Sequence, residues 1–340
     1  MNKTLLLFLL AACALTGCGQ PQNSNSTSAT KKSKIGLVFD VGGRGDKSFN
    51  DAAFSGLERA KKELDVEIEY IEPGEGSDRE AALRQLASQP DVALVFGIGF
   101  IFTDDITDIA KEYPDKKFAC IDYTVSDAKP LPKNLSAVLF REEEGSFLVG
   151  AIAAMTSKSG MIGFVGGMES PLIKRFLTGY RNGAEYVRPN IVVLDGYAGL
   201  DGNAFKNPAR GKELALGQYN RGADIIYHAS GVTGLGVFEA ARETKKFAIG
   251  VDMNQENEAP GLVLTSMVKM VDNAVFQTVA EVKAGKFQGG TVKVLGLEAK
   301  GVDYVYNETN KNLISDSTRA KAEELRAKLV SGAVKVGQSE

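Results

Sequence analysis

The sequence predicts an α/β protein made of two doubly wound lobes, each with a parallel sheet. Three observations indicate this class. From residue 34 onward, short apolar runs alternate with longer amphipathic stretches, which is typical of βαβ units. The pattern restarts after residue 141, and the length of 340 residues exceeds that of one typical domain.

The first lobe is expected to begin at residue 34. Residues 91–96 are almost continuously apolar, as in a strand that is covered on both faces. We expect strands at 35–39, 66–71, 92–96, 118–121 and 137–140, and helices at 49–64, 78–88 and 104–111.

The second lobe is expected to repeat this arrangement. We expect helices at 142–155, 172–187, 208–220 and 235–242, and strands at 161–165, 191–195, 225–228 and 247–250. Residues 142–144, all glutamate, are interpreted as a solvated helix start. A strand at 263–266 and a helix at 271–284 are expected to return to the first lobe.

These elements define the expected domains. The N-terminal lobe comprises residues 34–140 plus about 264–287. The C-terminal lobe comprises 141–262 plus about 288–315, and residues 316–340 form a C-terminal helix and tail. The chain therefore crosses between the lobes more than once, which predicts a hinge with several crossings.

The N-terminus has the features of an export signal. Lys3 is followed by an apolar stretch at 5–15 that is too short for a bilayer of ~30 Å, and then by the lipobox-like sequence 15–18. We therefore interpret residues 1–17 as a signal peptide and Cys18 as the lipidated residue. The polar segment 18–33 is expected to be a flexible tether, which predicts a protein anchored by lipid to the cell membrane and facing the periplasm or the cell exterior.

Composition excludes several classes of site. A net charge of −3 offers no basic surface for nucleic acid. Cys120 lies in an apolar strand pattern and is interpreted as a core residue, and His228 is the only histidine, so no metal site is expected. No cofactor is expected either. Asp46 precedes Lys47 where a phosphate-binding loop needs glycine, and residues 231–236 lack the spacing of a dinucleotide loop.

Carboxylates follow three of the predicted strands. Asp40, Asp122 and Asp252 each stand where an apolar run ends, and ligands bind outside the carboxyl ends of parallel strands. Carboxylates accept hydrogen bonds from neighbouring hydroxyls or from a heterocycle edge, so a polyol or a nucleoside suits them. Alternatively, each aspartate only caps the following helix.

Aromatic side chains complete the candidate site. Phe49 and Phe54 lie in the first loop and helix, and Phe205 lies in a polar loop of the second lobe. Rings from opposite lobes can sandwich a flat base. A position in the helix core is the other interpretation of Phe49 and Phe54.

Five segments resemble the basic membrane protein family of lipoproteins, the PnrA-like substrate-binding proteins of ABC transporters. The similarity covers nearly the whole mature chain, and its marks are residues 40–51, 141–150, 231–241, 250–252 and 265–269. The resemblance implies a type I periplasmic-binding-protein fold. It also implies a nucleoside ligand, most often a purine nucleoside, that is held between the lobes and delivered to an ABC permease.

The resemblance also implies roles for individual residues. Asn50 and Asp122 are expected to contact the base, with Phe205 and either Phe49 or Phe54 stacking on it. Ribose contacts are expected from Asp40, Gly231, Asp252 and Lys269. We expect a monomeric, non-enzymatic protein whose lobes close over the ligand. The rival interpretations are a binding protein for a sugar, autoinducer or amino acid, and a nucleoside-processing enzyme.

Overall fold

The computed structural model describes residues 32–74, 78–127 and 129–337, and these residues form two sheets of six strands. The first sheet has the order β2-β1-β3-β4-β5-β11 and is parallel throughout. Its strands are β1 (Lys34–Val38), β2 (Glu67–Ile71), β3 (Val92–Ile98), β4 (Lys117–Ile121), β5 (Leu135–Phe140) and β11 (Thr291–Leu295).

The second sheet has the order β7-β6-β8-β9-β10-β12. It is parallel except for the last pair, in which β12 runs antiparallel to β10. Its strands are β6 (Met161–Met168), β7 (Val192–Gly199), β8 (Ile225–Ala229), β9 (Phe247–Asp252), β10 (Val263–Lys269) and β12 (Val302–Tyr304). The predicted α/β class with two doubly wound lobes is confirmed.

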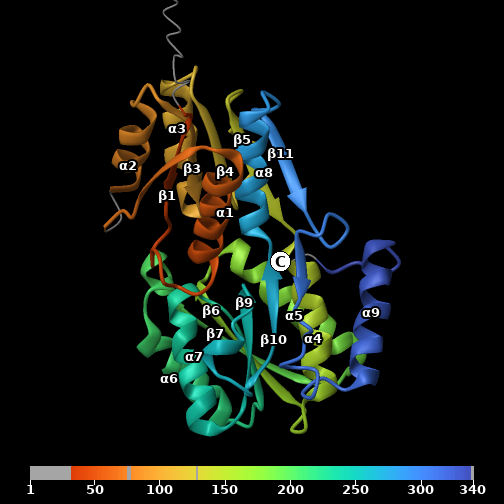
Figure 1. Ribbon diagram of the computed structural model, residues 1–340. Helices are drawn as coiled ribbons and strands as arrows, with labels where there is room; N and C mark the ends of the chain where they lie inside the picture. Colours follow the sequence, from red (N-terminus) through yellow and green to blue (C-terminus); the bar gives the residue numbers. More distant parts are fainter. Residues whose placement is uncertain (1–31, 75–77, 128, 338–340) are drawn as a thin grey trace, which may run out of the picture. The chain divides into compact units, whose positions relative to one another are not determined.

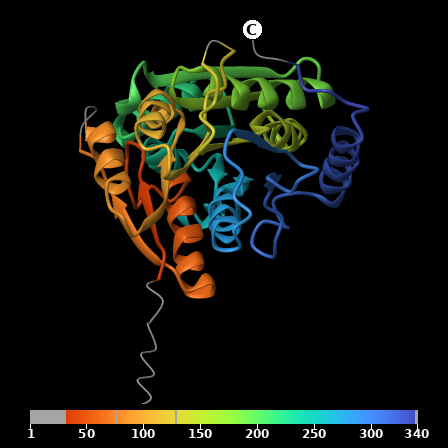
Figure 2. The same cartoon turned by 90° about the horizontal axis from the view of Figure 1, so that it is seen from above.

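Both lobes contain helices beside their sheet. The first lobe occupies the upper half of Figure 1 and the second the lower half. The first lobe has α1 (Phe49–Leu64), α2 (Asp78–Ala87), α3 (Thr103–Glu112) and α8 (Val271–Lys283). The second has α4 (Glu142–Thr156), α5 (Pro171–Val187), α6 (Pro208–Asn220), α7 (Gly234–Thr244) and α9 (Asp316–Val330). Figure 2 shows α9 at one side of the molecule, on the opposite side from α2. None of the helices in the described residues has the length and apolar character that a bilayer span requires.

Two strands, β10 and β11, each lie in the opposite lobe from the one expected. β10 was expected in the first lobe but pairs with β9 in the second sheet, and β11 was expected in the second lobe but pairs with β5 in the first. Helix α8 does pack against α1 of the first lobe. An apolar pattern shows that a strand is buried, but the choice between two similar sheets depends on long-range pairing that the pattern does not contain.

The lobes are joined where β5 leads into α4, where β10 leads into α8, and where β11 leads towards β12. Hydrogen bonds connect these crossing segments. Arg141 N donates to Leu295 O at 3.1 Å and Met270 N donates to Gly301 O at 2.8 Å. Leu297 N donates to a carboxylate oxygen of Glu144 at 2.8 Å. The crossings therefore form one hydrogen-bonded hinge region.

Candidate functional site

A cavity lies between the lobes at the carboxyl ends of both sheets. Its lining atoms enclose about 510 Å³ of space free of protein atoms, part of which is open to solvent. The lining residues are Asp40, Val41, Asp46, Phe49, Asn50, Gly99, Phe100, Asp122, Leu172, Ile173, Phe176, Phe205, Ala229, Ser230, Gly231, Val251, Asp252 and Lys269.

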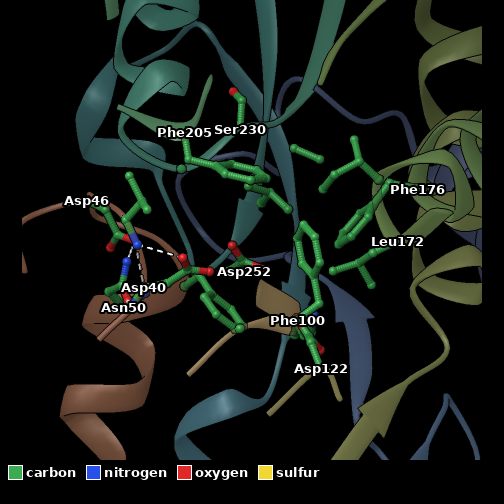
Figure 3. Close-up of a pocket in the computed structure, with 18 residues that line it drawn as sticks. Asp40, Asp46, Asn50, Phe100, Asp122, Leu172, Phe176, Phe205, Ser230 and Asp252 are labelled. Carbon is green, nitrogen blue, oxygen red and sulfur yellow. Dashed lines mark hydrogen bonds and ion pairs between the residues drawn. The ribbon is translucent and has the colours of Figure 1, made fainter. Parts of the chain in front are cut away.

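The loop after β1 is held by its own polar side chains, as the dashed lines in Figure 3 show. Asp46 accepts hydrogen bonds from the backbone N–H groups of Ser48, Asn50 and Asp51 at 2.9–3.1 Å, so it caps the start of α1. Asn50 accepts from Asp40 N at 3.0 Å and donates to Asp46 at 3.1 Å. Asn50 therefore both lines the cavity and fixes the loop that carries Asp40.

Asp40 occupies a tightly enclosed position beside Gly99. A Cβ atom on Gly99 would lie 2.0 Å from Oδ2 of Asp40, and Gly99 has a φ of +113°, so only glycine fits there. The backbone N–H of Val41 donates to Asp40 Oδ1 at 2.6 Å. Burial raises the pKa of Asp40 to about 7, although this hydrogen bond acts to lower it.

Asp122 and Asp252 occupy equivalent positions in the two lobes. They follow β4 and end β9, which have the same place in the two strand orders, and both have a φ of 63°. This left-handed conformation is unusual for a residue other than glycine, although aspartate tolerates it. Ser48 of the first lobe donates to Oδ2 of Asp252 at 2.5 Å, so Asp252 also contacts the opposite lobe. Burial raises the pKa of Asp252 to about 7.

Lys269 pairs with Asp122 across the lobe boundary. Its Nζ donates to Oδ2 of Asp122 at 2.6 Å, and both side chains are almost fully buried. Among the described residues, none donates a hydrogen bond to the other oxygen, Oδ1 of Asp122, which is also buried. A buried acceptor without a partner is costly, so a ligand with a hydrogen-bond donor would be stabilised there.

Glu142 is the second carboxylate beside Lys269. Its Oε1 lies 3.0 Å from Lys269 Nζ, and its side chain is 0% exposed. The interpretation of residues 142–144 as a solvated helix start is therefore wrong for Glu142. Nε and Nη2 of Arg175 both donate to Oε2 of Glu142, at 3.1 and 2.9 Å. These two residues lie outside the cavity lining, behind Lys269.

Aromatic rings from both lobes enter the cavity. Phe205 of the second lobe and Phe100 of the first have ring centroids 6.4 Å apart and planes at 73°. A Cβ atom on Gly167 would lie 2.3 Å from the Phe205 ring, so this ring rests on the glycine. Phe49 also lines the cavity, and Lys269 Nζ is 5.1 Å from its centroid.

Phe54 does not lie in the cavity lining, so its prediction as a ligand contact is corrected. Its ring packs against Phe39 and Tyr70 with centroid distances of 6.2 and 5.4 Å, and the Arg44 guanidinium lies 3.9 Å from its centroid. The helical repeat directs position 49 to the cavity and position 54 to a different face of α1. Among the two candidates, the lining therefore includes Phe49 alone.

His228 is buried beneath the site and has a structural position. Its Nε2 lies 3.1 Å from Oε1 of Gln255, and its Nδ1 lies 3.3 Å from the Ser230 hydroxyl. Because an amide oxygen only accepts, Nε2 carries the proton and Nδ1 accepts from Ser230. Burial lowers the pKa of His228 to about 4. Cys120 is a buried core residue, and the described residues contain no cluster of three or more histidine, cysteine or carboxylate ligands for a metal.

The structure brings together the other predicted ligand-binding residues. Asp40, Phe49, Asn50, Asp122, Phe205, Gly231, Asp252 and Lys269 all line one cavity. Sequence reasoning missed Asp46, Phe100, Ser230 and the cluster of Leu172, Ile173 and Phe176. Ser230 directly follows β8 and Phe100 is the second residue after β3, so the rule that favours strand ends was a signal that could have found them. The apolar cluster lies in α5 and resembles an ordinary core face.

The sequence and structure are similar to those of known proteins. A family profile described as "ABC transporter substrate-binding protein PnrA-like" matches residues 32–340. Basic membrane protein A of Borreliella burgdorferi is 34% identical over 335 aligned residues, covering 97% of this chain and 94% of the relative. An uncharacterized lipoprotein of Pyrococcus abyssi is 38% identical over 312 residues, covering 88% of this chain and 75% of the relative.

Solved structures agree with this result. An ABC transporter solute-binding protein from Aeropyrum pernix K1 has a TM-score of 0.82 and 29% sequence identity, covering 90% of this chain and 93% of that chain. A solute-binding protein from Conexibacter woesei has a TM-score of 0.72 at 22% identity, covering 90% of this chain and 99% of that chain, and shows the same fold.

Proposed function

The chain belongs to the family of PnrA-like ABC transporter substrate-binding proteins, and on this premise we propose that it captures nucleosides, with a preference for purine nucleosides, and delivers them to the permease of an ABC importer. A solute-binding role follows from the family. The residues that line the cavity are the observation that supports a nucleoside as the ligand.

The lining combines aromatic rings with hydrogen-bond acceptors. Phe49, Phe100 and Phe205 offer ring surfaces from both lobes, and flat heterocycles stack on such rings. The unpaired Oδ1 of Asp122 is suited to an N–H donor on the edge of a base. The carboxylates of Asp40 and Asp252 suit vicinal hydroxyls of a ribose. A nucleoside carries all three kinds of group.

The charge of the lining argues against anionic ligands. Among the lining residues that the structure describes, Asp40, Asp46, Asp122 and Asp252 are acidic, and Lys269 is the basic one. Lys269 is already neutralised by Asp122 and Glu142. A phosphate or carboxylate group placed here would meet uncompensated negative charge, so nucleotides and free amino acids fit less well than nucleosides.

The proposed mechanism is closure of the two lobes over the ligand. Contacts between lobes at the site include Ser48 with Asp252, Asp122 with Lys269, and Gln255 Nε2 donating to Lys47 O at 2.9 Å. A ligand that contacts both lobes would stabilise the closed arrangement. A radius of gyration that stays the same in solution scattering with and without ligand would count against this mechanism.

The binding assignment is tested by calorimetric titration of the soluble chain from residue 19 onward. Unfolding and refolding remove any carried ligand, and adenosine, guanosine, inosine, cytidine, uridine, ribose and AMP are then titrated. The expected result is tight binding of purine nucleosides, weak or absent binding of AMP and none of ribose. Absence of a binding signal for all seven compounds would overturn the nucleoside assignment.

A matched pair of variants tests the stacking role. Phe205→Leu removes the aromatic face from the cavity, and Phe54→Leu makes the same change outside it. Stacking of a base on an aromatic ring is worth about 1–3 kcal/mol, so Phe205→Leu should weaken purine nucleoside binding about 5- to 150-fold. Phe54→Leu should leave the Kd within about twofold. Equal effects of the two variants would contradict the proposed stacking.

We also propose that Cys18, which lies outside the described residues, carries the lipid anchor. The Pyrococcus abyssi relative is named a lipoprotein, and residues 15–18 match a lipobox. Metabolic labelling with a palmitate analogue should mark the wild type, whereas Cys18→Ser should remain unlabelled.

Delivery to the permease is tested by nucleoside uptake. Uptake by cells that lack this chain should be restored by the wild type and much less by Phe205→Leu.

A further inference from the structure

Lys269 is surrounded by charged groups from several elements. Asp122 follows β4, Asp252 ends β9, and Glu142 begins α4. Nζ of Lys269 is 2.6 Å from Asp122 and 3.0 Å from Glu142. Burial acts to lower the pKa of Lys269, but the three carboxylates offset this effect and raise it. The ammonium is therefore a fixed positive charge at the lobe boundary.

Aromatic rings restrict the ammonium further. Nζ lies 4.9 Å from the ring centroid of Phe140, 5.1 Å from that of Phe49 and 5.6 Å from that of Phe176. These rings belong to β5, α1 and α5. Cations are attracted to ring faces at such distances. The position of the ammonium is thus set by carboxylates and rings of both lobes.

Glu142 and Arg175 lie behind Lys269 and do not line the cavity. Nε and Nη2 of Arg175 donate to one oxygen of Glu142, and the other oxygen lies beside Lys269. The charges of Asp122, Lys269, Glu142 and Arg175 alternate in sign and sum to zero. The buried ammonium is therefore shared between Asp122 of the first lobe and Glu142 of the second.

We propose that Glu142, held by Arg175, is a positioning residue for the ligand site, because it keeps the Lys269 ammonium on Oδ2 of Asp122 and leaves Oδ1 of Asp122 free for a donor on the ligand. This inference rests on the proposed function, whose site it refines. The two oxygens of Asp122 already differ in their contacts. Lys269 donates to Oδ2, and Oδ1 has no hydrogen-bond donor among the described residues.

Without the carboxylate of Glu142, Asp122 would be the one carboxylate of the described residues that still forms an ion pair with Lys269. The ammonium would then be free to move between the two oxygens of Asp122, because the attraction between opposite charges is strong in a low-dielectric interior. Oδ1 would be occupied, and a ligand donor would have to displace the ammonium. The loss of affinity is expected to be specific to ligands that donate a hydrogen bond to Asp122.

The test uses Glu142→Gln together with the double variant Glu142→Gln/Arg175→Gln. The double variant leaves no unpaired arginine, so it separates positioning from the cost of a buried unpaired charge. The matched control is Asp195→Asn/Arg181→Gln, which removes an ion pair of 2.9 Å that joins the same helix, α5, to β7 but is partly exposed. Glu142→Asp keeps the charge and should restore part of the affinity.

Two measurements are made on each variant. Calorimetry should show purine nucleoside binding weakened about tenfold or more in both Glu142→Gln variants, in keeping with a lost charged hydrogen bond, and unchanged within about twofold in the control. ¹³C NMR of the Lys269 Cε should show a lowered pKa in Glu142→Gln, because one neighbouring carboxylate that raises it is gone. Together these results would support the positioning role.

Either of two outcomes overturns the inference: an affinity within about twofold of the wild type in Glu142→Gln, or a Lys269 titration that does not differ from the wild type. The proposed function fails in a different way, which is absence of nucleoside binding by the wild type itself. In that case the Lys269 titration still decides whether Glu142 controls the ammonium.

Discussion

Replacing Asp252 with asparagine should change how the stability of the ligand-free protein depends on pH. Burial raises the pKa of Asp252 from an ordinary value of 3.8 to about 7. A carboxyl group with a raised pKa in the folded state stabilises the fold fully below pH 3.8, and this contribution is lost as the pH rises through about 7. Asparagine has a similar shape, tolerates the φ of 63° and does not ionise.

The magnitude follows from the two pKa values. At 1.36 kcal/mol per pH unit, the full difference corresponds to about 4 kcal/mol, of which about 3 kcal/mol is expressed between pH 5 and pH 8. The free energy of unfolding of Asp252→Asn should therefore increase by about 3 kcal/mol relative to the wild type over this range. A constant difference in stability from the changed hydrogen bond with Ser48 affects the offset between the two curves and not their slopes.

The assay is urea unfolding of both proteins from pH 5 to pH 8, after removal of carried ligand. Other buried groups, including Asp40 with a raised pKa and His228 with a lowered one, are common to both proteins and cancel in the comparison. Asp195→Asn, at a partly exposed ion pair, serves as the control and should run parallel to the wild type. Parallel curves for Asp252→Asn as well would refute the idea that burial governs this carboxyl group.

Three further predictions concern two glycines and one cysteine. Gly99→Ala should destabilise the fold by about 1–3 kcal/mol and displace Asp40, since its φ is +113° and the new Cβ would lie 2.0 Å from that carboxylate. Gly217→Ala in α6, where a Cβ would meet no atom within 4 Å outside its own stretch of helix, should stabilise the fold by up to about 1 kcal/mol; urea unfolding measures both variants. The Cys120 thiol is fully buried and burial raises its pKa well above the usual value, so a disulfide reagent should modify the chain from residue 19 onward only as it unfolds. Rapid modification of the native protein would contradict this burial.

Most of the fold could be predicted because periodicity reports local burial. The expected strand at 92–96 and helix at 49–64 agree with β3 and α1. The lobe membership of β10 and β11 was not predictable in this way. These strands exchange lobes relative to a simple division of the chain, and their sheets have the same order of strands. Local sequence does not distinguish two such similar partners.

The site residues, like the fold, were predictable only in part. Asp40, Asp122 and Asp252 were found because parallel strands place their carboxyl ends at one edge. The choice between Phe49 and Phe54 stayed open and Phe100 was missed, since the face to which an aromatic side chain turns depends on tertiary packing, within a lobe for Phe54 and between lobes for Phe100. Glu142 resembled a solvated residue of an acidic run, and only its contacts with Arg175 and Lys269 reveal it as a buried partner.

The sequence by itself therefore determined the elements, the two-lobed class, the family and the carboxylates at the strand ends, because all of these depend on residue type and spacing along the chain. The tertiary structure decided which strands cross between lobes, which rings face the cavity and which acid neutralises Lys269. These features depend on contacts between residues far apart in sequence, such as Asp122 with Lys269 and Ser48 with Asp252, and the energy of a buried charge is set by its neighbours in space.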